Sequence, residues 1–178
     1  MALACGDANN DVAYRKTVEK ILLQLWSFFN NSAKKTAAYA KAVKESNAIT
    51  LSKEGSKRVA KKFKKACRSR WLSTERAIHG VFENFTALTQ TLRVLKEEGD
   101  ASAPGLLQQV SNIKFLGTVY LLQQVLPALS HLRRSFQGGN VSFAAIEPAI
   151  KFTIDEIKDV ANQQKPLKQL KKDLVDAR

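Results

Sequence analysis

The chain has 178 residues, and its 29 lysines and arginines against 16 aspartates and glutamates give a formal net charge of +13. This length suits a single compact domain, and a hydrophobic content of 44% excludes a wholly disordered chain. An isoelectric point near 9.9 points to an anionic partner, for which nucleic acid is the first expectation and an acidic membrane surface the second.

The sequence carries no sign of a membrane segment or of a signal peptide. No uninterrupted apolar run reaches the roughly 18 residues that a transmembrane helix needs, and the first residues lack a basic start followed by an apolar core. Only Cys5 and Cys67 are available for a disulfide, which favours a reduced setting. We therefore expect an intracellular, nuclear protein with no membrane partner.

The N-terminal third has the periodicity of helices. Apolar residues recur every three or four positions from residue 11 to residue 29, which predicts a first helix there. Ser32 is a good N-cap for a second helix that is expected to end at Lys44. Residues 45–55 are expected to connect this helix to the next element.

Residues 56–73, with the sequence SKRVAKKFKKACRSRWLS, form the most unusual segment of the chain. They contain eight cations, and no acid occurs between residues 55 and 74. Ser56 is expected to cap an amphipathic helix with Val59 and Phe63 on one side and lysines on the other. Such a run of like charges is typical of a solvated face, a tail or a nucleic-acid contact.

A long helix is expected to follow the basic segment. Ser73 is a suitable N-cap, and the apolar stripe behind it predicts a helix that ends near Glu98. Residues 100–105, DASAPG, are the clearest loop of the chain. The element before this loop is therefore predicted as one continuous helix.

The C-terminal part is also helical in pattern. Residues 106–136 are rich in apolar side chains, and we expect Asn112 to break this span and Pro127 to kink or end its helix. A helix is expected over residues 142–161, and Pro166 is expected to open a last, polar helix. No segment shows the alternation of period two that a strand requires.

These elements predict an all-α fold, an irregular bundle of about six to seven helices that lacks a β-sheet. We expect one domain over residues 1–178. Its sections are the N-terminal helices (1–55), the basic segment (56–73), the long core helices (74–137) and the C-terminal helices (138–178).

The residue types of an active site are present but do not form a constellation. Neither His79 nor His131, the two histidines, has a cysteine or carboxylate at metal-ligand spacing. The acids at 97–98 and at 155–156 are adjacent, so on a helix they point about 100° apart. Cys67 lies among cations that can lower its pKa, but no histidine is near it in sequence, so a packing role is favoured. We expect no catalytic residue, no metal, no cofactor and no small-molecule substrate.

Two interpretations of the basic segment compete. A lysine-rich face often serves only to keep a helix solvated. Arg68 and Arg70 beside Trp71 favour nucleic acid, because a guanidinium holds a phosphate with two hydrogen bonds and an indole stacks on a base. Stacking of this kind is worth roughly 1–3 kcal/mol per base. The alternative for Trp71 is a buried anchor for the next helix.

The segment CRSRWLS at residues 67–73 resembles the Cys-x-x-Arg-Trp-Leu-Ser signature of hAT-superfamily DNA transposases and of the domesticated proteins derived from them. Ala2-Leu3-Ala4 resembles the end of the Cys-x-x-His-Arg-Leu-Ala-Leu stretch of that family. Further similar elements are Ala77-Ile78, Val81-Phe82-Glu83-Asn84-Phe85, Leu129-Ser130 and Ser135-Phe136-Gln137, where Phe136 replaces the usual leucine.

The family has an RNase H-like catalytic core interrupted by a large helical insertion, and the resemblance implies that this chain corresponds to the insertion alone. Its two catalytic aspartates and its catalytic glutamate lie in the flanks, so the resemblance implies no enzyme activity for these residues. It implies that Trp71 stabilises a base displaced from the duplex at a transposon end, with Arg70 holding a phosphate. The start at Met1, inside a family helix, suggests a gene fragment or a truncated domesticated copy.

We therefore expect a transposase-derived helical domain that binds DNA phosphates and stacks an unpaired base. One alternative is a protein-interaction module in which apolar surfaces around Phe28, Phe29 and Leu122 meet a protein partner or a second copy. Another is a transposon remnant that does not bind DNA. The residues expected to contact DNA are Lys57, Lys61, Lys64, Lys65, Arg68, Arg70 and Trp71.

Overall fold

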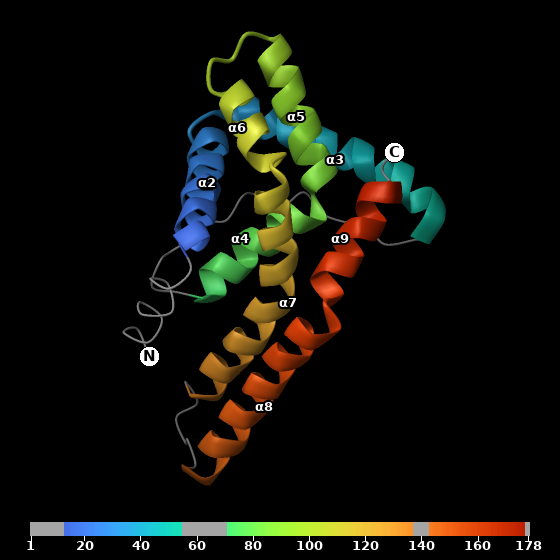
Figure 1. Cartoon of the computed structure of the whole chain (residues 1–178). Coiled ribbons are helices and arrows are strands. Elements are labelled where there is room, and N and C mark those ends of the chain that lie inside the picture. Colours follow the sequence, from blue (N-terminus) through green and yellow to red (C-terminus); the bar gives the residue numbers. More distant parts are fainter. Residues whose placement is uncertain (1–12, 55–70, 137–142, 177–178) are drawn as a thin grey trace.

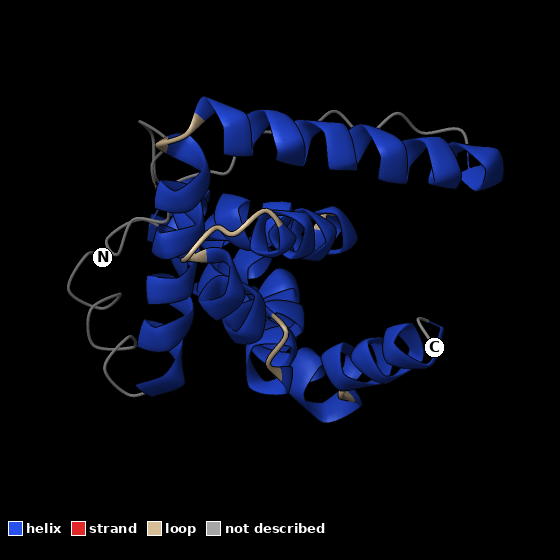
Figure 2. Cartoon of the chain, turned by 90° about the horizontal axis from the view of Figure 1, so that it is seen from above, coloured by secondary structure: helices blue, strands red, loops and turns tan. Residues whose placement is uncertain are grey.

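The computed structural model describes residues 13–54, 71–136 and 143–176, and within these ranges it contains helices and short turns but no strand (Figures 1 and 2). This confirms the all-α prediction. The described helices number eight, slightly more than expected. They are α2 (Ala13–Asn30), α3 (Ala33–Glu54), α4 (Trp71–Glu83), α5 (Phe85–Glu97), α6 (Ala103–Val110), α7 (Ile113–Ser135), α8 (Phe143–Gln163) and α9 (Lys165–Asp176).

The long helix α7 is the axis of the arrangement. α4 crosses it on one side, while α8 and α9 follow one another back along it (Figure 1). At the other end, α5 packs on α3 and α6, and α2 contacts both α3 and α6. The described chain therefore consists of a compact group, α2 to α7, to which α8 and α9 are attached through α7.

The hydrophobic core lies between helices α2 to α7. Its largest fully buried side chains include Leu25 of α2, Ile78 of α4, Leu88 of α5 and Phe115 of α7. The core cluster of the described residues contains no side chain from α8 or α9. These last two helices pack on the outside of α7 and contribute less to the stability of the group.

Several helix boundaries predicted from the sequence are wrong, among them the loop expected over residues 100–105, whose last three residues belong to α6. α3 continues to Glu54, where residues 45–55 were expected to form a connection, because no proline or glycine interrupts it before Gly55. The helix expected from Ser73 to Glu98 is two helices, separated at Asn84. The Asn84 amide donates to the Gly80 carbonyl oxygen at 3.1 Å, and such local bonding by an asparagine competes with the helical backbone.

α7 begins where the sequence predicted; of the two outcomes expected at Pro127, a kink or an end of the helix, the end does not occur. The Asn112 side chain accepts a hydrogen bond from the Lys114 backbone N–H at 2.8 Å, which caps the new helix. Pro127 lies inside the helix, although proline cannot donate the backbone hydrogen bond of its position. Its neighbours Leu126 and Ala128 are buried, and their burial offsets the loss of one bond.

The break between α8 and α9 stores backbone strain at a residue that is not glycine. Gln164 has φ of 49°, in the left-handed region, which is costly for a residue with a Cβ. We expect Gln164→Gly to raise the free energy of unfolding by about 0.5–1 kcal/mol. Urea unfolding followed by circular dichroism measures this change. Gln163→Gly, one residue earlier in α8, is the control and is not expected to stabilise; equal effects of the two variants would contradict the assignment of strain.

Candidate nucleic-acid interface

The residues predicted to contact DNA lie at and before the start of α4. Lys57, Lys61, Lys64, Lys65, Arg68 and Arg70 fall outside the described residues, as does the helix that Ser56 was expected to cap. Trp71 is the first residue of α4. Of this part of the chain, the structure therefore describes helix α4, which contains the last three residues of the basic segment.

Helix α4 already includes Trp71, three residues before the first helical position that an N-cap at Ser73 implies. Ser73 was expected to precede the helix as its N-cap, but it lies in the first turn, and the buried Thr74 follows it. The Trp-Leu-Ser part of the signature is thus helical. Trp71 therefore belongs to the same helix as the buried residues that hold α4 in the protein.

The inner face of α4 is held in the core. Ala77, Ile78 and Val81 recur at helical spacing, and their exposed fractions are 3%, 0% and 0%. On the adjoining face, the ring of Phe82 meets the ring of Tyr120 edge to face, with centroids 4.9 Å apart. These contacts fix α4 against α7.

His79 lies at the same contact between α4 and α7. Its Nδ1 lies 3.0 Å from the Gln123 amide nitrogen, which can only donate, so Nδ1 accepts and the proton is on Nε2. The Nε2 group lies 3.2 Å from a carboxylate oxygen of Glu83, four residues along the helix, so the expectation that His79 has no carboxylate at such a spacing is wrong. Within the described ranges, no group of three or more His, Cys, Asp or Glu side chains is placed to hold a metal ion.

A hydrogen bond continues this link from α7 to α9. The Tyr120 hydroxyl donates to Asp173 at 2.6 Å, and Gln169 donates to the other oxygen of that carboxylate at 2.8 Å. Removal of the phenol from water, together with the neighbouring Asp173 carboxylate, raises the pKa of Tyr120 above its ordinary value of 10.0. Tyr120 therefore joins α4, through Phe82, to α9.

Tyr120→Phe is expected to lower the free energy of unfolding at neutral pH by about 1 kcal/mol, because the Asp173 carboxylate loses a donor. Since the unfolded phenol loses its proton near pH 10.0 while the folded one keeps it, stability falls as the pH rises above that value. The variant should show a shallower fall in this range. Urea unfolding measured across the alkaline range checks both statements, and an unchanged pH profile would contradict the second.

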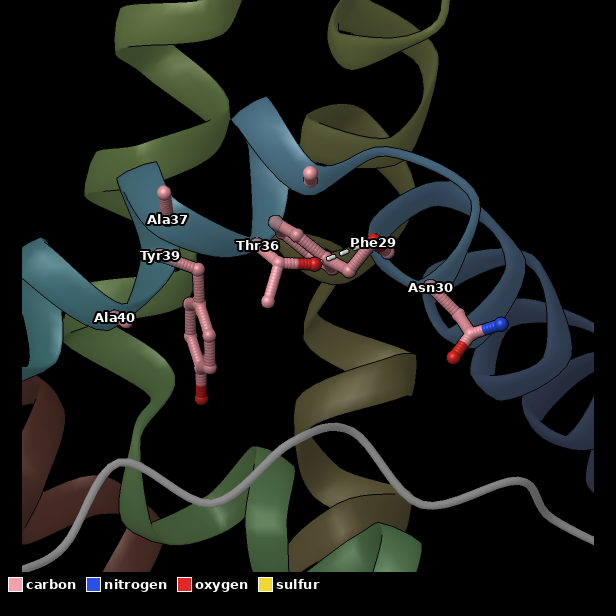
Figure 3. A pocket seen from close by; sticks show the side chains of 7 residues that line it. Phe29, Asn30, Thr36, Ala37, Tyr39 and Ala40 are labelled. Atoms are coloured by element: carbon pink, nitrogen blue, oxygen red, sulfur yellow. Dashed lines mark hydrogen bonds between the residues drawn. The ribbon is translucent and has the colours of Figure 1, made fainter.

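A cavity of about 430 Å³ lies where α2 meets α3. Phe29, Tyr39 and three alanines line it, and the Thr36 hydroxyl donates to the Phe29 carbonyl oxygen at 2.6 Å (Figure 3). Burial raises the pKa of Tyr39 above its ordinary value. None of the described lining residues carries a carboxylate, imidazole, thiol or amine, so these residues provide no acid–base pair.

Of the three residues around which an apolar surface was expected, Phe28, Phe29 and Leu122, the second is buried and the other two are partly exposed. Phe29 is 3% exposed, and Phe28 and Leu122 pack partly buried against the core. The ammonium group of Lys35 also lies 3.8 Å from the ring centroid of Phe28. Phe29 is therefore closed to a partner, while Phe28 and Leu122 keep part of their surface exposed.

Comparison with known proteins places the chain in no family. No family model, no curated protein and no solved structure matches it. The resemblance to hAT transposases stays a prediction that depends on the residues quoted for it. Among the described helices, none is long and apolar enough to cross a membrane.

Proposed function

We propose that this chain is a transposase-derived helical domain that binds DNA through residues 56–73. The observation that carries the proposal is that eight of the thirteen excess positive charges lie in this acid-free segment, which runs directly into α4. Phosphate neutralisation by such a segment releases counterions and gives binding that weakens steeply with salt.

The position of α4 supports this proposal. The first turn of α4 contains no acid, so the positive end of the helix dipole adds to the field of the cations before it. Ile78, two helical turns after Trp71, is fully buried. A contact made at position 71 is therefore made by a rigid part of the protein, which reduces the entropy lost on binding.

The role of Trp71 in the proposal is to stack on an unpaired base, with Arg70 on a neighbouring phosphate. Stacking favours DNA in which a base is already unpaired, because a paired base must first leave the duplex. The expected ligands are branched, hairpin or single-stranded DNA. The proposal includes no strand cleavage, so nuclease assays with Mg²⁺ or Mn²⁺ are expected to show no product.

Trp71→Ala is expected to weaken binding to hairpin or gapped DNA by about tenfold, the value of one stacked base. Binding to plain duplex should change little, because it depends on the cations alone. Fluorescence anisotropy with both ligands at one salt concentration measures the difference, and Trp71→Phe, which keeps a ring, should recover part of the affinity. Equal losses for the two ligands would count against stacking.

A further inference from the structure

Exposed apolar side chains gather on the two C-terminal helices. Of nine large hydrophobic residues that are exposed in the described ranges, six belong to α8 and α9. Neither helix contributes to the core cluster of the described residues. Their amphipathic faces are thus only partly covered by α7.

The residues that face α7 define how each helix is turned. On α8, Thr153 is 3% exposed, and on α9, Leu170 is 6% exposed. Pro166 is also buried, and Asp173 accepts the hydrogen bond of Tyr120 from α7. Both helices run back along α7 in the same direction (Figure 1). Residues that lie to one side of the α7-facing row on α8 are therefore on the same side of the molecule as residues to that side of the row on α9.

Four aliphatic residues lie on one side of this buried row and are called here the aliphatic flank. Ile154, Leu167 and Leu174 directly follow the inward-facing residues at 153, 166 and 173. One residue turns a helix by about 100° in a fixed sense, so all of them lie on the same side. Ile150 is one turn before Ile154. The members are Ile150, Ile154, Leu167 and Leu174, with exposed fractions of 40%, 45%, 51% and 43%.

The charges beside the aliphatic flank are mostly positive. Lys151 is three residues before Ile154 and Lys158 is four residues after it. Lys171 is four residues after Leu167 and three residues before Leu174. Glu147 is the single acid at such a spacing among the described residues of the two helices. The other acids of α8 lie elsewhere on it, and two of them share the opposite side with Phe152.

We propose that the aliphatic flank binds an acidic amphipathic helix of a partner protein. Apolar side chains at helical spacing on the partner would cover the flank, as in other complexes where a helix lies in an apolar groove. Carboxylates beside them would pair with Lys151, Lys158 and Lys171. This interaction goes beyond DNA binding and uses none of the residues proposed for it.

The same charges disfavour two other occupants. A second copy of the chain would bring the same lysines to the interface with one glutamate to pair with them, which leaves cations unpaired. Nucleic acid would leave the aliphatic side chains in contact with polar phosphate groups, whereas nucleic-acid interfaces are polar and cationic. A partner helix that carries both apolar residues and carboxylates complements both the aliphatic side chains and the lysines beside them.

The test uses the full chain and two synthetic fluorescent helices of about five turns. Both carry leucines at i, i+3, i+4 and i+7; one has glutamates and the other lysines between them. Anisotropy titration should show binding of the glutamate peptide and at least about tenfold weaker binding of the lysine peptide. Ile154→Ser with Leu167→Ser should weaken binding of the glutamate peptide by about tenfold or more, whereas Phe152→Ser, on the opposite side, should leave it unchanged.

Charge reversal gives a second readout that does not depend on apolar contact. Lys158→Glu with Lys171→Glu is expected to reverse the preference between the two peptides, while affinity for DNA changes little in all of these variants. No binding of the glutamate peptide, equal binding of both peptides, or an equal loss in Phe152→Ser would overturn the proposal. So would a dimer in sedimentation that Leu167→Ser dissociates, or binding to phosphatidylserine vesicles without binding to the peptide.

Discussion

Phe115→Ala is expected to lower the free energy of unfolding by about 3–5 kcal/mol, the largest effect on stability of any single change considered for this chain. Phe115, the third residue of α7, is fully buried, and α7 is the helix that contacts α2, α4, α6, α8 and α9. Removing its ring leaves a cavity. The surrounding helices cannot close it completely, because moving into it would break their other contacts. Urea unfolding monitored by circular dichroism gives the value.

Ile113→Ala is the matched control for this variant. Ile113 is on the same helix two residues earlier, and 57% of it is exposed, so its replacement should change stability by less than about 0.5 kcal/mol. A loss below about 1 kcal/mol for Phe115→Ala, or equal losses for both variants, would show that α7 is not the central support of the fold.

Replacing six of the eight cations of the basic segment by glutamine is expected to weaken binding to single-stranded DNA by about a thousandfold at low salt. The affected residues are Lys57, Lys61, Lys64, Lys65, Arg68 and Arg70. Each neutral residue removes one phosphate contact and the release of its counterions. The fold should persist, because the core residues of α4 to α7 are unchanged. Anisotropy titration with a labelled oligonucleotide measures the loss.

The control for this variant removes the same number of charges from α8 and α9. Its residues are Lys151, Lys158, Lys165, Lys168, Lys171 and Lys172, all of them exposed. Since both variants have the same net charge, a general attraction between a basic protein and DNA would weaken equally in both. A local site in residues 56–73 predicts a much smaller loss for the control, about tenfold or less.

Local sequence signals predicted the class of the fold and several of its boundaries. Helical periodicity identified α2, the break expected at Asn112 marks the start of α7, and Pro166 marked the start of α9 within one residue. These features depend on nearest neighbours along the chain, so the sequence alone can reveal them. The limits of α3, the separation of α4 from α5 at Asn84 and the continuation of α7 through Pro127 depend on competition between local and tertiary contacts.

The two candidate surfaces differ in how far the sequence could reveal them. The basic segment is visible in the sequence because charge is local, and what the structure adds is the anchoring of α4 directly behind Trp71. The aliphatic flank was not foreseen. Its four residues have the same spacing as core residues, and periodicity cannot tell which of the apolar residues on α8 and α9 are covered by α7. The asymmetry of charge around Ile154 and Leu167 was the available signal.

The salt dependence of DNA binding tests the central claim most directly. With six phosphate contacts, the logarithm of the association constant for single-stranded DNA should fall against the logarithm of the salt concentration with a slope of about −4. The slope should be much shallower when six of the eight cations of residues 56–73 are replaced, with only Arg58 and Lys62 left, and nearly unchanged in the variant of α8 and α9. Absence of binding at low salt, or the same slope in all three proteins, would contradict a DNA-binding function of the basic segment.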